Sequence, residues 1–376
     1  MQLVQVNNSF ETFTSSASGA IATHIWEVSR RAKLRSLIMS RSSSAPTLEG
    51  IEVEHLPPSP ERVPGWREWR GRLIRRFTGW REAEQRSHAR NVARALRRRG
   101  LTRSCLLLHN DPEMAVYLRA ECPEARIVHH FHNPVIVKEV FRRRFSASVN
   151  AVTAVSEYVA DEVRRLYGTK SVRVVYNGVD LERFKPAPRK NTQRITFNFL
   201  GRTGIEKAPD ILLRAALKLA LEGLPLRVQL IGSNHWGRWE ADAYQSQLAN
   251  LCEEVVRAGG EVCATGHLSR EQVPEQLRNA DVHVLPSRWE EPCALSLLEG
   301  MSSGLPVVAT RTGGTPEILG QDGLLFSKDS VVELCSHLRK LLVDEPFRLA
   351  LGARARRRAQ LFTWERCLEG FMEVLA

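Results

Sequence analysis

The sequence predicts an α/β protein made of two doubly wound domains. Short apolar, β-branched runs alternate with amphipathic stretches along almost the whole chain, a pattern typical of parallel strands joined by helices. The alternation occurs twice, on either side of a charged segment with two prolines near residues 183–193, which we interpret as a linker. A length of 376 residues also exceeds one ordinary core and favours two domains. We therefore expect the carboxyl ends of both sets of strands to surround one ligand-binding cleft.

The first half of the chain predicts six strands with helices between them. The strands are 1–7, 34–39, 104–110, 125–131, 151–156 and 172–178, and the clearest helices are 22–34, 115–122 and 157–168.

The second half repeats the same alternation. The strands are 194–201, 226–232, 281–286 and 305–311, and the helices between them include 209–223 and 269–280. Residues 40–50, SRSSSAPTLEG, are expected to form an exposed loop.

Composition narrows the class of protein. Hydrophobic residues make up 43% and charged residues 26%, which excludes a largely disordered chain. No apolar run approaches the roughly 20 residues that span a bilayer, and the first residues, MQLVQVNNSFETF, do not resemble a secretory signal. Seven cysteines without a C-x-x-C pair favour reduced thiols over a disulfide framework. We expect a cytoplasmic protein.

One segment carries most of the net charge of +12. Residues 61–100 hold 13 Arg, no Lys or Asp and 4 Glu, a balance of +9. Within residues 62–81, Trp66, Trp69, Leu73, Phe77 and Trp80 follow a helical spacing with arginines around them. Such a helix suits an anionic membrane surface, and it could instead pack on its own domain with solvated arginines. Nucleic acid is a weaker alternative because no known binding module accompanies the charge.

In the stretch from Asp281 to Phe326, the carboxylates of Glu291 and Glu299 stand eight residues apart. After the strand DVHVLP comes Glu291 and then Pro292, which suits the first position of a helix extending to about Ser302. The free amides of that helix would form a positive end suited to a phosphate or a sugar oxygen. Glu291 would stand at the mouth and Glu299 two turns deeper, holding hydroxyl groups of one elongated ligand. The alternative is an acidic residue favouring the helix dipole and an ordinary helix Glu.

Cations and glycines are expected at neighbouring strand ends. Gly201 and Arg202 end the first strand of the second domain, and Lys207 follows five residues later. Such cations suit a diphosphate, although solvated loop cations are the alternative. The adjacent glycines 313–314 permit close backbone approach to a ligand.

These motifs together resemble glycosyltransferase family four, a retaining group with the two-domain GT-B fold. The matching motifs run in order: G-R-x4-K, G-H-L at 266–268, P-S-x-W-E-E-P, the E-x7-E pair, L-P-V-V-A-T, G-G-T-P-E-I-L and D-G-L-L-F. The resemblance implies two Rossmann-like domains: an acceptor-side domain over residues 1–185 joined by the last helix, 363–376, and a nucleotide-sugar-binding domain over residues 186–362. Residues 35–100 lie outside it.

The resemblance also implies roles for individual residues. Arg202 and Lys207, after Gly201, would hold the donor diphosphate. Glu299 would bind ribose hydroxyls and Glu291 the hydroxyls of the donor sugar.

Backbone groups complete the implied donor site. The backbone around Leu268 would meet the base, and the amides at Cys293, Ala294 and Leu295 the sugar or phosphate. Many family members read G-F-G after the first Glu, whereas this chain reads Pro-Cys-Ala, which leaves the donor sugar open.

Two histidines and one glycine are expected in the first domain's part of the site. In similar proteins the histidine corresponding to His132, in F-H-N-P, contacts the donor sugar near the reacting carbon, and His109 ends the strand beside it. His109 could instead be a structural histidine. A metal cluster is disfavoured because no carboxylate or cysteine completes the set, so no metal cofactor is expected. Gly19 is expected in a tight turn where the backbone approaches the donor or the acceptor.

The sequence thus predicts a retaining transfer of a hexose-type sugar to a glycan, lipid-linked or small-molecule acceptor, with a UDP-sugar as the favoured donor. The site would use no protein nucleophile, and the protein could lie peripherally at the inner face of a membrane. A sugar-nucleotide epimerase of the same architecture is the enzymatic alternative. A non-catalytic membrane-surface binding protein is the other.

Overall fold

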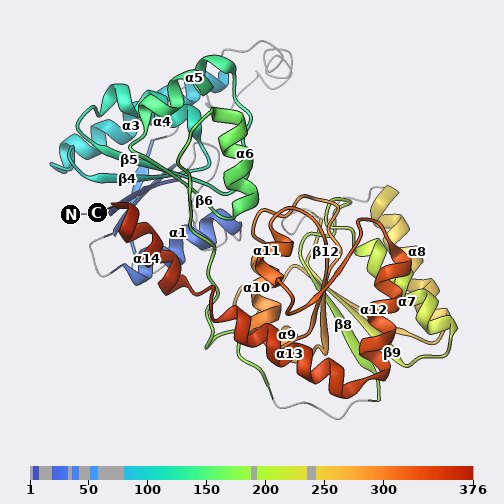
Figure 1. Cartoon of the computed structure of the whole chain (residues 1–376). Coiled ribbons are helices and arrows are strands. Elements are labelled where there is room, and N and C mark those ends of the chain that lie inside the picture. Colours follow the sequence, from blue (N-terminus) through green and yellow to red (C-terminus); the bar gives the residue numbers. More distant parts are fainter. Residues whose placement is uncertain are drawn as a thin grey trace. The chain divides into compact units, whose positions relative to one another are not determined.

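The computed structural model describes residues 3–7, 19–32, 36–41, 51–57, 80–187, 193–234 and 243–375. The chain forms two compact units (Figure 1). The N-terminal unit comprises residues 1–176 with 367–376, and the C-terminal unit comprises residues 177–366.

The boundary at residue 177 has a local cause. The side-chain amide of Asn177 donates a hydrogen bond to the Cys293 carbonyl at 3.0 Å, and the Ser302 hydroxyl donates to the Phe184 carbonyl at 2.8 Å. Residues 177–184 therefore pack on the C-terminal unit, although the sequence had placed them in the first domain.

The N-terminal unit contains a fully parallel sheet of seven strands, ordered β3-β2-β1-β4-β5-β6-β7. The strands are β1 (Leu3–Val6), β2 (Ser36–Arg41), β3 (Glu52–Leu56), β4 (Cys105–His109), β5 (Arg126–Phe131), β6 (Ala151–Ala154) and β7 (Arg173–Val174). Five of the predicted strands are confirmed, and the one predicted over 172–178 shortens to the two residues of β7. Strand β3 was missed because its sequence, EVEHL, is largely polar and lies at the sheet edge.

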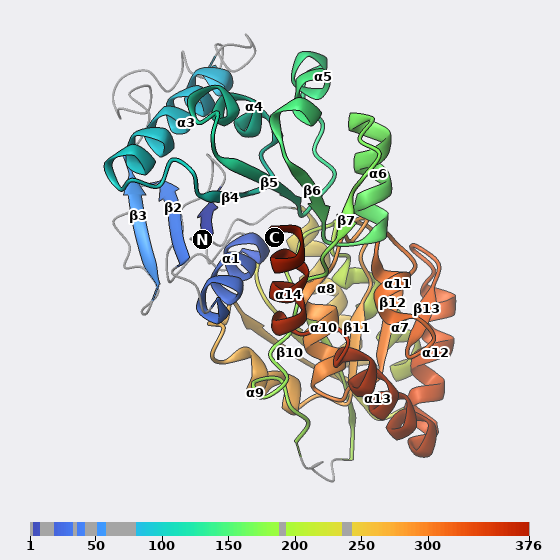
Figure 2. The same ribbon diagram turned by 60° about the vertical axis from the view of Figure 1, so that its left-hand side comes forward.

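Six helices of this unit are described: α1 (Ala20–Arg31), α3 (Trp80–Arg98), α4 (Pro112–Glu121), α5 (Glu139–Ser148), α6 (Glu157–Tyr167) and α14 (Trp364–Leu375). Helices α3, α4 and α5 cover one face of the sheet, while α1 and α14 lie side by side on the other (Figures 1 and 2). Side-chain caps from Asp111 and Ser156 start α4 and α6, and Gly168 ends α6 in the left-handed conformation.

The last helix returns to the N-terminal unit, as the family resemblance implied. Its Phe371 is fully buried, with ring centroids 5.5 Å from His24 and 4.9 Å from His130. The Val374 carbonyl accepts a hydrogen bond from Arg126 at 2.9 Å.

The C-terminal unit contains a second fully parallel sheet, ordered β10-β9-β8-β11-β12-β13. Its strands are β8 (Ile195–Leu200), β9 (Leu226–Ile231), β10 (Glu261–Gly266), β11 (Val282–Leu285), β12 (Val307–Thr310) and β13 (Leu324–Phe326). The four predicted strands are confirmed. The two edge strands, β10 and β13, were not predicted.

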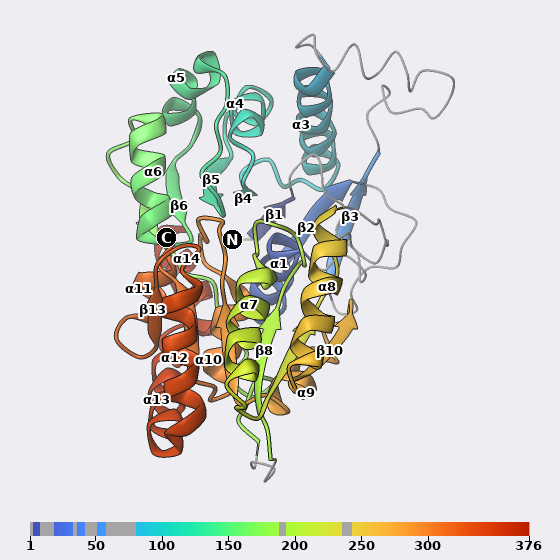
Figure 3. The same cartoon turned by 90° about the vertical axis from the view of Figure 1, so that its right-hand side faces the viewer.

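Seven helices of this unit are described: α7 (Pro209–Leu221), α8 (Ala243–Arg257), α9 (Val273–Arg278), α10 (Leu295–Ser302), α11 (Thr315–Leu319), α12 (Val331–Val343) and α13 (Glu345–Ala359). Helix α7 lies between α8 and α12 (Figure 3). Its buried leucines pack on Phe197 and Phe199 of β8 to form the core of this unit.

Three predicted helices have different bounds. The helix predicted over 22–34 ends at Arg31, and the one predicted over 269–280 shortens to α9. Helix α10 begins at Leu295 and not at Pro292. The helix predicted over residues 62–81, with its tryptophans and arginines, falls mostly on residues that the structure does not describe, 58–79. Helix α3 begins at Trp80, near the end of that predicted helix.

Among the described residues, no helix is both long enough and apolar enough to span a bilayer.

In each sheet the strand order reverses once, between β1 and β4 and between β8 and β11. At such a switch point the two connections leave toward opposite faces, and a crevice opens outside the carboxyl ends of the strands. Of the polar residues singled out from the sequence, His109 ends β4, Arg202 and Lys207 follow β8, and Glu291 follows β11, so these lie at the two points.

Candidate active site

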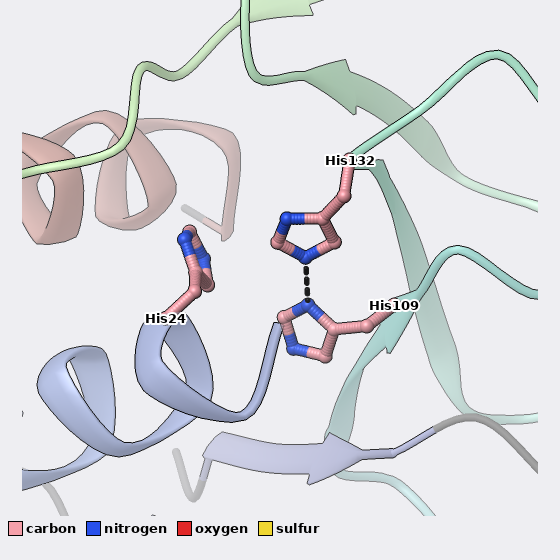
Figure 4. A group of neighbouring side chains, drawn as sticks. All are labelled: His24, His109 and His132. Carbon is pink, nitrogen blue, oxygen red and sulfur yellow. Dashed lines mark hydrogen bonds between the residues drawn. The ribbon is translucent and has the colours of Figure 1, made fainter. Parts of the chain in front are cut away.

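At the N-terminal unit's switch point, three buried side chains form one hydrogen-bonded chain. Gln5 belongs to β1, His109 ends β4 and His132 follows β5. His109 Nε2 lies 3.0 Å from Gln5 Oε1, and His109 Nδ1 lies 3.0 Å from His132 Nε2 (Figure 4). The sequence predicted that His109 and His132 would share the site, and the structure brings them into direct contact. Gln5 was not predicted.

Two further imidazoles complete a histidine cluster of His24, His109, His130 and His132. The His24 ring, on α1, stacks on His130 with centroids 5.0 Å apart and lies edge-on to His132 at 4.8 Å. His130 Nδ1 lies 2.8 Å from the Thr153 hydroxyl. His130 and His132 share one strand face, as predicted, while His129 packs on Phe131 of the other face. His24 was missed because its helical position carries no motif.

Burial keeps the strand histidines of the cluster neutral. It lowers the pKa of His109, His130 and His132 well below the usual histidine range, because an imidazolium would lose its hydration, and the neighbouring histidines add repulsion. Neutral imidazoles can accept hydrogen bonds or ligate a metal.

Three members of the cluster meet the spacing of a metal site. One nitrogen each from His24, His109 and His132 lies within 4.8 Å of the others. Sets of three histidine ligands with an open fourth position are known for zinc. Here, however, the His109 and His132 nitrogens already lie at hydrogen-bonding distance of each other. Whether the protein uses no metal, as the sequence suggested, stays a prediction.

Asn110 fixes the segment that carries His132. Its side-chain oxygen accepts hydrogen bonds from the backbone amides of His132 and Asn133, both at 3.1 Å. Its own φ of +55° is left-handed, which asparagine tolerates better than most residues. Sequence reasoning missed this residue, although an Asn directly after a buried strand is a usable signal.

Gly19 lies directly before helix α1, and the residues that would form the other half of its predicted turn, 8–18, lie outside the described residues. It is the N-cap of α1 with φ −65° and ψ 150°, which other residues also adopt, so no left-handed turn requires glycine here. Its carbonyl accepts hydrogen bonds from both the amide and the hydroxyl of Thr23. A role of Gly19 toward the donor stays a prediction.

At the C-terminal unit's switch point, a buried carboxylate holds a lysine. Glu291 Oε1 lies 2.6 Å from Lys207 Nζ and also accepts a hydrogen bond from the Ser287 hydroxyl. The Glu291 side chain is 3% exposed and that of Lys207 22%. Glu291 was expected at the mouth of the site facing a sugar. In the structure it lies beneath Lys207, whose ammonium is the more accessible partner.

The first of the two adjacent glycines explains how Glu291 is held. Gly313 has φ +50°, and a Cβ placed there would lie 2.4 Å from the Glu291 carbonyl oxygen. The Gly313 amide donates to the Glu290 carboxylate and the Gly314 amide to the Glu291 carbonyl, both at 2.7 Å. The close approach predicted for these glycines is thus toward the protein's own backbone.

Arg202 is exposed at the end of β8 and makes no hydrogen bond or ion pair with the described residues. The turn that carries it depends on close backbone packing. The amide of Gly201 donates to the Ile231 carbonyl, and a Cβ on Gly232 would lie 1.9 Å from the Gly201 carbonyl oxygen. An arginine on a rigid turn without a partner among those residues is available to an anion.

Helix α10, which begins four residues after Glu291, offers backbone amides at its first turn. Its N-cap, Ala294, supplies no side-chain cap, so the amides of the first turn lack that partner. Burial raises the pKa of the Cys293 thiol to about 12, which keeps it protonated and unsuited to act as a nucleophile. Glu299 lies within α10 and Leu268 just after β10, and both are half-buried. Their roles toward a nucleotide stay predictions.

Two doubly wound parallel sheets, with polar groups at each switch point and a last helix that returns to the first unit, define the class of GT-B glycosyltransferases. The family described as Glycosyl transferases group 1 matches residues 180–358, and Glycosyltransferase Family 4 matches residues 49–183. The chain belongs to glycosyltransferase family four.

Individual proteins agree with this assignment. A D-inositol 3-phosphate glycosyltransferase of Kineococcus radiotolerans is 30% identical, with 87% of this chain and 81% of that protein covered. Spore coat protein SA of Bacillus subtilis is 25% identical over 70% of this chain and 76% of its own length. The crystal structure of Anabaena HepE in complex with UDP has a TM-score of 0.75 at 18% identity, covering 100% of this chain and 99% of that one. At that identity the likeness establishes the fold.

Proposed function

We propose that this glycosyltransferase moves a hexose, with retention of configuration, from a nucleotide-diphosphate sugar to a hydroxyl of a glycan, lipid-linked or small-molecule acceptor. The observation that carries the proposal is the group of positive charges at the C-terminal unit's switch point. Lys207 is held there by Glu291, which follows β11, and Arg202 extends from the end of β8, the strand that also precedes Lys207. UDP is the proposed nucleotide, because solved structures of HepE hold UDP and UDP-glucose.

The chemistry needs charge stabilisation more than a nucleophile. As the bond between the anomeric carbon and the diphosphate oxygen breaks, negative charge grows on the diphosphate. The two cations and the amides of α10 would stabilise it without reorganising. The acceptor oxygen would bond to the anomeric carbon on the same face, and its proton would pass to the departing phosphate.

We also propose that no divalent metal is required at the diphosphate. Arg202 and Lys207 supply positive charge where a metal would otherwise act, so EDTA is expected to leave turnover unchanged. A requirement for added Mg²⁺ or Mn²⁺ would contradict this proposal.

Turnover of a labelled UDP-sugar tests the assignment of the two cations. Arg202→Ala and Lys207→Met should each lower kcat by about 10²–10³-fold, the usual loss on removing one transition-state donor. Arg278→Ala, an exposed arginine on α9 just before the amino end of β11, is the matched control and should stay near wild type. Near-normal turnover in both site variants would refute the proposal.

The same labelled donor separates the alternatives. Transfer to an acceptor with an α-anomeric product from an α-linked donor supports a retaining transferase. Conversion of the donor sugar without any acceptor would indicate an epimerase, and an intact donor would indicate a binding protein.

We further propose that residues 62–81 attach the protein to an anionic membrane surface on its cytoplasmic side. The support is the charge of +9 over residues 61–100 and the spacing of the tryptophans. Each basic residue near such a surface contributes about 1 kcal/mol.

Reversing Arg67, Arg70 and Arg75 to Glu should abolish sedimentation with phosphatidylserine vesicles at low salt. The same reversal at three exposed cations of the C-terminal unit should not: Lys218, Arg257 and Arg278. Equal sedimentation of both variants would contradict the proposal.

A further inference from the structure

The side chain of Gln5 has a defined orientation. Its amide nitrogen donates to the Ile25 backbone carbonyl at 3.1 Å and also to the Ser29 hydroxyl. A backbone carbonyl only accepts hydrogen bonds, so the group facing it is the NH2. The other end of the amide, Oε1, therefore faces His109 Nε2 at 3.0 Å.

This orientation sets the tautomers of the two histidines in turn. Because Gln5 Oε1 can only accept, His109 carries its proton on Nε2. A neutral His109 then has a bare Nδ1, which must accept. The contact of 3.0 Å between His109 Nδ1 and His132 Nε2 is consequently donated by His132 Nε2–H, and His132 Nδ1 has no proton.

The other strand histidines take the opposite tautomer. His129 Nε2 accepts from the backbone amide of Asp111 at 3.1 Å, so its proton lies on Nδ1. The Thr153 hydroxyl donates to the His129 carbonyl, so its oxygen accepts from His130 Nδ1–H. The Nε2–H tautomer of His109 and His132 is thus imposed by Gln5 and is not a common feature of the cluster.

His132 is the end of the chain closest to solvent. Gln5 and His109 are fully buried, whereas His132 keeps 6% of its surface exposed. Burial lowers the pKa of His109 and of His132, which agrees with neutral rings in the Gln5–His109–His132 hydrogen-bond series. Among the described residues, the other titratable groups that act on these two rings are His24, His129 and His130, and none of these carries a negative charge that would favour a second proton.

We propose that Gln5 and His109 are positioning residues that hold His132 in its Nε2–H tautomer, so that His132 Nδ1 serves as a neutral hydrogen-bond acceptor for a hydroxyl of the transferred sugar. This role rests on the proposed function. Its physical benefit concerns charge: a lone pair toward a sugar that becomes oxocarbenium-like stabilises it, whereas an imidazolium would oppose it. A zinc ion held between His109 Nδ1 and His132 Nε2 would require the opposite tautomer of His132, because a ligating nitrogen carries no proton.

The tautomers can be read directly by long-range ¹H–¹⁵N spectra of the full chain labelled at histidine, recorded without substrate. We expect Nε2–H for His109 and His132, and Nδ1–H for His129 and His130 as internal references. Gln5→Met, which removes the acceptor, should lower the Nε2–H population of His132. Gln5→Glu should restore it, because a buried, protonated carboxyl can donate to the Ile25 carbonyl and accept from His109 Nε2.

Kinetics completes the test. Gln5→Met should lower kcat at least tenfold with little change in donor KM, and Gln5→Glu should recover part of the loss. The upper limit is about 10⁴-fold, the cost of a wrong histidine tautomer in a serine protease. As a control, Gln229→Met removes a buried glutamine of the C-terminal unit and should leave the His132 signals unchanged.

Several outcomes would overturn the proposal. A proton on His132 Nδ1 in the wild type refutes the chain itself, even if the Gln5 variants do not fold. One equivalent of tightly bound Zn²⁺ that replaces the His109–His132 hydrogen bond does the same. An unchanged kcat in folded Gln5→Met, despite a changed tautomer, refutes the positioning role. A wild type with the predicted tautomers and no transferase activity would instead refute the proposed function, and the role assigned to His132 Nδ1 would fall with it.

Discussion

Replacing Lys207 and replacing Glu291 should lower the free energy of unfolding by different amounts, although both changes break the same ion pair. Removing one partner of a buried ion pair costs about 3–5 kcal/mol when the other charge is left without compensation. Lys207→Met leaves the Glu291 carboxylate, 3% exposed, with the Ser287 hydroxyl as its one remaining partner among the described residues, so we expect a loss of about 3 kcal/mol. Glu291→Gln leaves Lys207, 22% exposed, which can turn toward water, so we expect about 1 kcal/mol.

Urea unfolding of the C-terminal unit, with a double-mutant cycle, measures this difference. If the double variant is nearly as stable as Glu291→Gln alone, the coupling is about 2–3 kcal/mol. In a unit of this size 1 kcal/mol corresponds to about 2–4 °C in Tm, so Lys207→Met should lower Tm by about 6–12 °C. Arg339→Met, which breaks an exposed pair with Glu222, is the control and should cost less than about 1 kcal/mol. Additive effects, or equal losses from the two single variants, would refute the buried arrangement.

Three other predictions concern stability. Gly313→Ala should destabilise the C-terminal unit by more than about 2 kcal/mol in a urea titration, because both backbone strain and a steric clash result. Gly223→Ala is the control, since its backbone is also left-handed but open space surrounds it, so its smaller loss measures the backbone strain without the clash. Asn110→Ala should lower the N-terminal unit's unfolding free energy by about 2–3 kcal/mol, since two backbone amides lose their acceptor, and Asn110→Asp should retain more of it. Because burial lowers the pKa of these histidines in the folded state, the unfolded N-terminal unit takes up protons first as the pH falls. The free energy of unfolding should therefore be complete above about pH 6.5 and should decrease as the pH is lowered further. The decrease should reach up to about 1.4 kcal/mol per pH unit for each histidine. Urea titrations at pH 7.5, 6.5 and 5.5 check this, and a pH-independent midpoint would contradict it.

The sequence predicted the fold well where burial is complete. Central strands such as β4, CLLLH, are fully buried and therefore almost wholly apolar, which makes them easy to recognise. Edge strands were missed for the same physical reason, since β3 and β10 are only partly buried and their sequences are therefore less apolar. The start of α10 was also misplaced, because Pro292 suits several extended positions as well as the first turn of a helix.

Contacts between distant positions were harder to predict than motifs. Lys207 and Glu291 were both singled out, yet nothing in a spacing of 84 residues indicated that they form an ion pair. The burial of Glu291 depends on Gly313, whose left-handed turn packs against it. His24 and Gln5 carry no motif, and they reach the site only because α1 and β1 lie beside the switch point.

The most direct test of the proposed function compares the binding of UDP and uridine by calorimetry, in EDTA. Both ligands share the base and ribose, so the difference in affinity reports the diphosphate alone. If Arg202 and Lys207 hold the diphosphate, UDP should bind the wild type at least about 100-fold more tightly than uridine, and Arg202→Ala should remove most of that difference. Equal affinities for the two ligands, or a preference that Arg202→Ala leaves intact, would contradict the proposed role of these cations.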